Sequence, residues 1–264
     1  MMIVTGASSG IGQALAAEAL KGGYRVVLAA RNREAMQAWA GQLGMPEHQY
    51  LIVQADVTLK ADCQRLIEEA VRRFGRIDVL VNNAGISMRA LFADLDLGVV
   101  ERLMQVNFWG MVYCTHYALP YLLESRGSVV GVSSIAGYKG LPGRSAYSAS
   151  KFAMHGFLES LRIENLNKGL HVLIACPGFT ASNIRKTALA ADGSQQGESP
   201  RSEERMMQAD EVARHMLTAI SKRTHRLVLT GQGKLTVCLN KWFPKLVDRL
   251  VFNHMAKEPG TPLV

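Results

Sequence analysis

Tyr147 and Lys151 stand four residues apart in the stretch YSASK. On a helix this spacing makes the two side chains neighbours on one face. Tyrosine is a poor proton donor near neutrality because its ordinary pKa is about 10, and a nearby ammonium lowers that pKa by stabilising the phenolate. The pair could therefore supply a general acid or base. The same spacing also occurs by chance on solvated helices, so other residues must decide.

A glycine-rich turn, TGASSGIG, occupies residues 5–12 between an apolar run and an amphipathic stretch. Glycines allow a tight turn and let backbone amides approach a pyrophosphate at the N-terminus of the helix that follows. A lone turn of this kind is weak evidence, but its place between a strand and a helix strengthens it. The residues expected to contact a dinucleotide here are Gly6, Ser8, Ser9, Gly10, Ile11 and Gly12.

The end of the second predicted strand indicates which dinucleotide is used. An NAD site usually places an acid there for the ribose 2′-hydroxyl. This chain has Ala30, Arg31 and Asn32 instead. A guanidinium can bind a 2′-phosphate in bidentate fashion, whereas a carboxylate would repel it. Arg31 therefore favours NADP(H) over NAD(H), although it could also be a solvated arginine at the start of a helix.

Four further landmarks complete a pattern. An NNAG motif ends at Gly85, Asn107 lies in a predicted helix, Ser134 precedes Tyr147 by 13 residues, and Pro177-Gly178 ends the sixth predicted strand. In order and spacing the chain resembles the short-chain dehydrogenase/reductase family over residues 5–178. The resemblance implies a single-domain, doubly wound Rossmann-type fold, usually in a homodimer or homotetramer. It also implies reduction of a carbonyl, or oxidation of an alcohol, by hydride transfer.

The resemblance assigns roles to residues that the spacing alone leaves open. Tyr147 would be the proton donor, Ser134 would hydrogen-bond the carbonyl oxygen, and Lys151 would also hold the nicotinamide ribose. Asn107 would anchor a water that leads from Lys151 to solvent. Judged alone, Ser134 could be a strand-end hydroxyl and Asn107 a hydrogen bonder inside a helix. Cofactor contacts are implied for Asp56, Val57, Asn83, Ala84, Gly85, Pro177, Gly178 and Ser182.

Two departures from the family pattern stand out. The first strand has only four residues, 1–4, before the glycine motif. Ser182 occupies a position where many relatives have threonine, and it keeps a hydroxyl for the cofactor amide. Asp56 could instead serve only the N-terminus of the next helix. We expect none of these to change the assignment.

These residues need a scaffold, and the rest of the sequence predicts one. Short apolar runs alternate with segments of helical period, which is typical of a parallel sheet flanked by helices in an α/β domain. We expect one domain over 1–264. The predicted strands are 2–4, 24–29, 50–54, 77–81, 128–133 and 170–175, and the predicted helices are 11–21, 32–43, 60–73, 97–124 in two parts and 147–167.

Two segments break the alternation. Residues 183–205 are polar and predict a long loop over the substrate. In the helical segment 232–264, apolar residues recur at helical period (Leu235, Leu239, Trp242, Leu246 and Leu250), with Lys241, Lys245 and Arg249 on another side. Pro244 should divide this segment into two helices. It could pack against the core or a subunit, form a hydrophobic lid, or lie on a membrane surface.

Composition limits the remaining possibilities. The chain has 264 residues, 48% hydrophobic and 20% charged, as in ordinary globular proteins. Its four widely spaced cysteines favour neither a disulfide framework nor a metal site, so a reducing compartment, the cytoplasm, is expected. The glycine loop begins too early to leave room for a signal peptide. Much of the net charge of +8 lies beyond residue 213, and no nucleic-acid motif accompanies it.

Three functions remain to be compared. The first is an NADP(H)-dependent oxidoreductase for a small carbonyl or alcohol substrate, which could be hydrophobic, such as a lipid or steroid. The second is a non-catalytic NADP(H)-sensing protein on the same fold, against which the intact set of Asn107, Ser134, Tyr147 and Lys151 argues. The third is an epimerase or dehydratase of the related extended fold, for which the chain is short.

Overall fold

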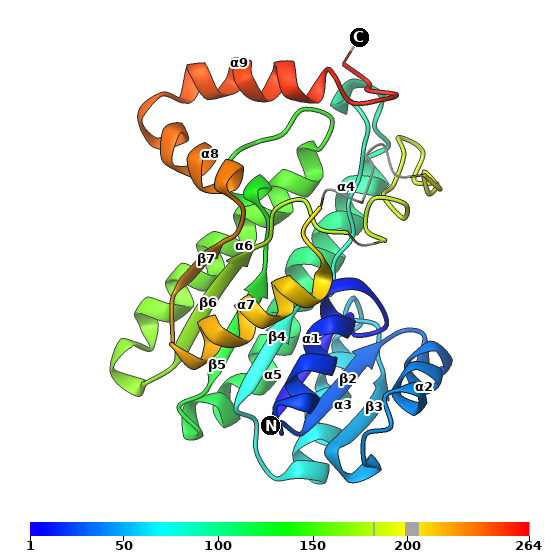
Figure 1. The fold of residues 1–264 in the computed structure, drawn as a ribbon, viewed down its shortest axis with the longest axis vertical. Coiled ribbons are helices and arrows are strands. Elements are labelled where there is room, and N and C mark those ends of the chain that lie inside the picture. The colour runs from blue at the N-terminus through cyan, green and yellow to red at the C-terminus, as the bar shows by residue number, and fades with distance from the viewer. Residues whose placement is uncertain (182, 199–205, 264) are drawn as a thin grey trace.

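A single sheet of parallel strands forms the centre of the computed structural model, which describes residues 1–181, 183–198 and 206–263. The strand order is β3-β2-β1-β4-β5-β6-β7 (Figure 1). Most of the strands are buried on both faces, and this explains their Val, Ile and Leu content. The strands are β1 (Met2–Thr5), β2 (Val26–Ala30), β3 (Tyr50–Gln54), β4 (Val79–Asn82), β5 (Ser128–Val132), β6 (His171–Cys176) and β7 (Arg226–Val228).

Helices cover both faces of this sheet, so the fold is a doubly wound Rossmann-type domain. On one face, a cluster that includes Leu15, Met36 and Met216 packs α1 (Gly10–Lys21), α2 (Arg33–Gln42) and α7 (Ala209–Ser221) against the strands. On the other, Leu66 and Leu158 belong to the cluster of α3 (Lys60–Phe74), α5 (Gly110–Glu124) and α6 (Ser145–Glu164). The predicted α/β class and parallel sheet are confirmed.

The predicted helix over 97–124 consists of α4 (Leu97–Met104), a π-helical turn (Gln105–Trp109) and α5. Such turns frequently mark functional positions, and this one carries Asn107. Pro244 is the first residue of α9 (Pro244–Met255), directly after α8 (Gly231–Trp242), so it divides the C-terminal segment as predicted. Figure 1 shows both helices at one end of the molecule, beyond the sheet.

Two elements were not predicted, namely α7 and β7. The strand β7 has three residues and lies at the edge of the sheet, where Arg226 is exposed, so it lacks a long apolar run. The segment 183–198 contains no helix or strand and makes only isolated bridges, as the prediction of a loop requires. Residues 199–205 of that loop, and Ser182, lie outside the described residues.

Candidate active site

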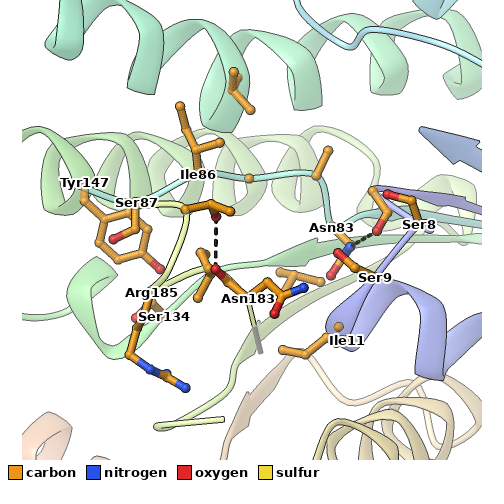
Figure 2. A pocket seen from close by; sticks show the side chains of 18 of the residues that line it. Ser8, Ser9, Ile11, Asn83, Ile86, Ser87, Ser134, Tyr147, Asn183 and Arg185 are labelled. Carbon is orange, nitrogen blue, oxygen red and sulfur yellow. Dashed lines mark hydrogen bonds between the residues drawn. The ribbon is translucent and has the colours of Figure 1, made fainter. Parts of the chain in front are cut away.

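A cavity of about 900 Å³ opens at the carboxyl ends of the strands, and it includes the point between β1 and β4 where the strand order reverses. Figure 2 shows Ser8, Ser9 and Asn83 at one end, with Tyr147 and Ser134 at the other. The predicted site residues that line it are Gly6, Ser8, Ser9, Gly10, Ile11, Arg31, Asp56, Val57, Asn83, Ala84, Gly85, Ser134, Tyr147, Lys151, Pro177 and Gly178.

The glycine loop is held by the end of β4. The Asn83 side-chain amide donates to the carbonyl oxygens of Thr5 (2.9 Å) and Gly6 (3.2 Å), and the amides of Asn83 and Ala84 both donate to the Thr5 hydroxyl. Gly6 has φ +64°, which a side chain would strain. Gly12 does not line the cavity, but a Cβ there would lie 2.4 Å from the Gly6 carbonyl oxygen. The loop therefore requires glycine for its shape.

The N-terminus of α1 has the properties of a phosphate site. Its N-cap residue Ser9 makes no side-chain capping hydrogen bond, and its first turn contains no acid. The first amides of a helix lack intrahelical partners, and the helix dipole makes this end positive. Because Ser8, Ser9, Gly10 and Ile11 also line the cavity, these residues fit a dinucleotide pyrophosphate.

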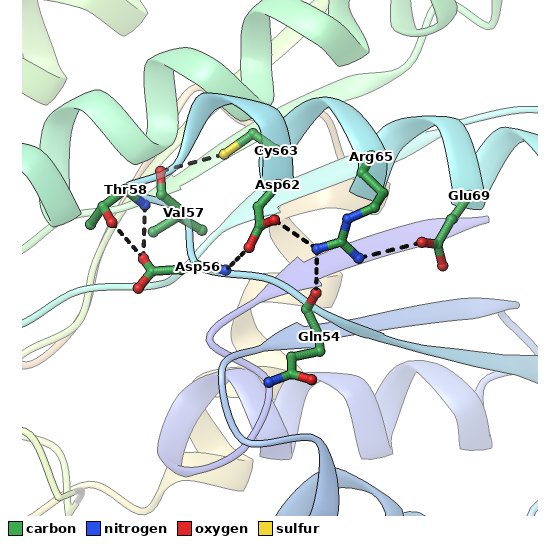
Figure 3. A network of polar contacts seen from close by, with 8 residues as sticks. All are labelled: Gln54, Asp56, Val57, Thr58, Asp62, Cys63, Arg65 and Glu69. Atoms are coloured by element: carbon green, nitrogen blue, oxygen red, sulfur yellow. Dashed lines mark hydrogen bonds and ion pairs between the residues drawn. The ribbon is translucent and has the colours of Figure 1, made fainter.

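Arg31 and Asp56 lie farther along the same end of the cavity. Arg31 is exposed, and it forms no ion pair within the described part of the chain. One oxygen of Asp56 accepts from the amide (2.9 Å) and hydroxyl (2.8 Å) of Thr58 (Figure 3). Asp56 thus shapes the turn before α3 as well as lining the cavity. Its contact with a cofactor stays a prediction.

Behind this turn, α3 is tied to the end of β3. Asp62 accepts from the Asp56 amide (2.9 Å) and pairs with Arg65, which also donates to the carbonyl of Gln54 (Figure 3). The hydrogen bond from the Asp56 amide is the largest influence that lowers the pKa of Asp62, followed by the one from Arg65. This network fixes the backbone that presents Asp56 and Val57 to the cavity.

At the other end of the cavity, Tyr147 and Lys151 project from α6, and Ser134 follows β5. Burial raises the pKa of Tyr147, while its hydrogen bond with Ser134 and the nearby charge of Arg144 oppose that rise. Burial also lowers the pKa of Lys151 to about 8. A phenol, an ammonium and a hydroxyl thus share one end of the cavity, and both titratable groups have shifted pKa values, as is common at functional sites.

The expected lowering of the Tyr147 pKa by Lys151 is wrong for this structure. The Lys151 Nζ lies over the Tyr147 ring, 5.6 Å from its centroid, and donates to the carbonyl oxygen of Val132 at 2.9 Å. Burial is the largest influence on the pKa of Tyr147, and Lys151 is not among the groups that lower it.

Asn107 does not line the cavity but lies directly behind it. Its side-chain Oδ1 accepts from the Ile86 amide (2.8 Å). Its Nδ2 donates to the Ile86 carbonyl (3.0 Å) and to the Ser150 hydroxyl (2.9 Å). Asn107 therefore connects the segment after β4 to α6 beside Lys151. Asn107 is buried, with 1% of its surface exposed, and in this structure it links these two segments.

Several lining residues were not singled out from the sequence. Ile86 and Ser87 follow the NNAG motif, Arg144 directly precedes α6, and Asn183 and Arg185 come from the predicted substrate loop. Figure 2 shows Ser87 and Arg185 at the end of the cavity that carries Tyr147 and Ser134. Ile86 and Ser87 directly follow the NNAG motif, and Arg144 lies three residues before Tyr147. This closeness in the sequence could have identified them as lining residues.

A family model described as short chain dehydrogenase matches residues 1–193. The chain belongs to the short-chain dehydrogenase family. It is 34% identical to cattle dehydrogenase/reductase SDR family member 7B, with 98% of this chain and 82% of that protein covered. It is also 41% identical to the 11-beta-hydroxysteroid dehydrogenase-like 4A protein of Arabidopsis thaliana over 73% of this chain, a match that spans 64% of the length of that relative.

Solved structures of similar proteins have the same fold as this short-chain dehydrogenase. A short-chain dehydrogenase from Streptomyces avermitilis is 28% identical, with a TM-score of 0.80 over 97% of this chain and 99% of that one. A Burkholderia phymatum relative in complex with NAD is 24% identical, with a TM-score of 0.80 over 93% and 94% of the two chains. The second comparison supports the fold alone.

Proposed function

We propose that this short-chain dehydrogenase is an NADP(H)-dependent oxidoreductase that interconverts a carbonyl and an alcohol. The observation that supports this most directly is one cavity with a phosphate-type helix N-terminus at one end and Tyr147, Ser134 and Lys151 at the other. When bound, the nicotinamide supplies or accepts the hydride. Tyr147 gives the proton to the carbonyl oxygen, and takes it back in the oxidative direction.

The chain's own residues supply the remaining steps. The Ser134 hydroxyl donates a hydrogen bond to the oxygen on which negative charge develops. Lys151 holds the ribose of the nicotinamide and replaces the proton that leaves Tyr147, for which its pKa of about 8 is suited. Asn107 keeps the segment after β4 against α6, which orients Lys151.

The preference for NADP(H) rests on Arg31. Its guanidinium stands at the cavity just beyond the end of β2, where an NAD site usually has an acid. Glu34 and Asp56 also line this part of the cavity, but neither occupies that position. Arg31 would hold the 2′-phosphate, and Ser8, Ser9 and Gly10 the pyrophosphate.

The experiment that tests this function is a screen of carbonyl compounds with NADPH consumption as the readout. Tyr147→Phe should reduce kcat by at least about a hundredfold and leave the Kd for NADPH nearly unchanged, because only the proton donor is lost. Full activity in this variant would overturn the mechanism. Tight NADPH binding without turnover of any carbonyl would favour the sensing alternative instead.

The substrate is proposed to be hydrophobic, such as a lipid or steroid. Four of the relatives carry 11-beta-hydroxysteroid dehydrogenase in their names. The surface of α8 and α9 is consistent with this, since Leu235, Trp242, Leu246 and Leu250 are 58%, 76%, 49% and 51% exposed. Large apolar side chains in such number on one segment mark a contact surface.

The helices α8 and α9 are also basic, and we propose that their exposed residues bind an anionic membrane surface. Lys234, Lys241, Lys245 and Arg249 are all exposed among the apolar residues. Asp248 is the single acidic residue between positions 231 and 255, and it pairs with Lys139. Apolar and basic residues together, with a tryptophan, are typical of helices that lie at the lipid–water interface. No helix in the described ranges is long and apolar enough to cross a bilayer.

Co-sedimentation with vesicles of phosphatidylcholine and phosphatidylserine tests the membrane contact. Trp242→Asp and Leu246→Asp should each reduce the bound fraction severalfold, and added salt should reduce it for the wild type. Phe92→Asp is the matched control because Phe92, 65% exposed, lies outside the C-terminal helices. Equal recovery of all these proteins would contradict the proposal.

We also propose a homodimer or homotetramer formed through α5 and α6, in the cytoplasm. Trp109, before α5, is 43% exposed, and Phe152 and Ile163 on α6 are 46% and 58% exposed. Phe152→Glu should lower the oligomeric state measured by sedimentation velocity, and Leu59→Glu, at another exposed apolar position, should not. The cytoplasmic location rests on the four free cysteines.

A further inference from the structure

The C-terminal residues after α9 return to the substrate end of the cavity. Hydrogen bonds from Glu258 to Met255 (3.1 Å) and from Thr261 to Glu258 (3.1 Å) fold this tail into consecutive turns. A Cβ on Gly143 would lie 3.3 Å from Pro262, so the tail contacts the loop before α6. Figure 1 shows the turns after α9 at the same end of the molecule as this helix, on the side that carries α4.

Glu258 of this tail is buried between two arginines. Its Oε2 lies 3.6 Å from Arg89 and 4.0 Å from Arg144, and the exposed fraction of the Glu258 side chain is 4%. Arg89 also donates to the carbonyl oxygen of Pro259 at 2.8 Å. The two arginines come from different segments, one after β4 and one before α6. Buried charges of this kind are retained when they are paired, because an unpaired one is strongly destabilising.

Arg144 connects this pair to the reacting groups. It lines the cavity with Ser87 and Tyr147, three residues before Tyr147 in the chain. Its guanidinium donates to the Ser87 hydroxyl and to the Met88 carbonyl, both at 3.3 Å. The arginine is therefore part of the wall that a substrate before Tyr147 would meet. The Glu258 carboxylate, which does not line the cavity, lies beside its other terminal nitrogen, Nη2.

We infer that Glu258 is a positioning residue for the substrate wall: it holds Arg144 against Ser87 and Met88 and offsets its charge toward the cavity. This rests on the proposed function, in which the substrate stands before Tyr147. The consequence is a wall suited to neutral substrates. A carboxylate on the substrate would be attracted only weakly to Arg144, because Glu258 already offsets the charge of the same guanidinium.

Glu258→Gln tests this inference because it keeps the shape of the side chain and removes its charge. The test compares the KM values of two carbonyl substrates that differ by one carboxylate. In Glu258→Gln the ratio of these KM values should shift by about tenfold in favour of the anionic substrate. This is the effect expected of one charge about 10 Å away at the effective dielectric constant of a protein site. The Kd for NADPH should stay constant, because the tail lies at the other end of the cavity.

Three further variants separate positioning from a general loss of structure. Asp248→Asn is the matched control: it removes an acid from the same C-terminal segment, whose partner Lys139 does not line the cavity. Glu258→Asp should restore most of the wild-type KM ratio. In an Arg144→Gln background, Glu258→Gln should no longer change the ratio. An unchanged ratio in Glu258→Gln, or the same shift in Asp248→Asn, would overturn the inference while leaving the proposed function intact.

A second measurement does not depend on turnover. Hydrogen exchange of the backbone amides at 86–91 and 141–144 should accelerate severalfold in Glu258→Gln, because Glu258 joins these two segments through Arg89 and Arg144. It should stay unchanged in Asp248→Asn, whose partner Lys139 lies outside both segments. Equal exchange in the wild type and Glu258→Gln would refute the positioning role even if no carbonyl substrate were turned over.

Discussion

Mild acid should destabilise this protein through one histidine behind the active site. His155 lies on α6 one turn after Lys151, with its Nε2 2.7 Å from the Ser133 hydroxyl and its ring against Tyr138 at 4.5 Å between centroids. It is 7% exposed. Burial is the main cause that lowers its pKa from 6.5 to about 4. The folded protein therefore binds a proton at His155 less readily than the unfolded chain does.

The size of the effect follows from these two pKa values. Stability rises with pH wherever the unfolded state holds more protons, so the loss occurs as the pH falls from the unfolded pKa of 6.5 through the folded pKa of about 4. Over this whole window the loss approaches about 3 kcal/mol, and between about pH 7 and about pH 5 it is about 2 kcal/mol.

Urea unfolding at these two pH values measures the loss. His155→Gln retains a group that can hydrogen-bond Ser133 but does not titrate, so the variant should lose about 2 kcal/mol less than the wild type on acidification. His116→Gln, at an exposed position of α5, should behave as the wild type does. If His155→Gln showed the same pH dependence as the wild type, the buried neutral histidine would not be its cause.

Other predictions concern the cofactor end and the core. Arg31→Ser should reduce the preference for NADPH over NADH by about 10- to 100-fold in calorimetric titrations, since a charge-assisted bidentate contact is lost; comparable Kd values in the wild type would contradict this. Gly12→Ala should weaken NADPH binding at least about tenfold, because its Cβ would lie 2.4 Å from the Gly6 carbonyl; unchanged binding would show that the loop adapts. Leu158→Ala should lower the free energy of unfolding by about 2–5 kcal/mol, whereas Leu166→Ala, at a 63% exposed position, should lower it little.

The sequence predicted the glycine-loop end of the cavity more completely than the end around Tyr147. Strands buried on both faces produce apolar runs, and the glycine loop requires glycine for steric reasons, so both are visible as residue types. The contacts of Arg144 and Glu258 are not visible in this way. They are 114 residues apart in the chain, and only the folded tail brings them together.

Side-chain chemistry at the reacting end was also only partly predictable. The spacing of Tyr147 and Lys151 correctly placed both on α6 at one cavity. It did not predict how burial raises the pKa of Tyr147, because burial depends on the strands and loops around the helix. The short edge strand β7 was missed for a related reason, since its place in the sheet comes from pairing with β6 rather than from its own pattern.

The tail that contacts Arg144 lies outside the part of the chain that the family model matches. The two parts can therefore evolve at different rates. The family model ends at residue 193, before α8, α9 and the tail that carries Glu258. The dinucleotide end depends on strand tips that the sheet holds in register, whereas the outer substrate wall depends on a segment beyond the sheet. Under the proposed function, exchanges in that segment would change which substrates are accepted and leave the residues for hydride transfer unchanged. Grafting a relative's C-terminal segment is then a direct route to altering substrate selectivity.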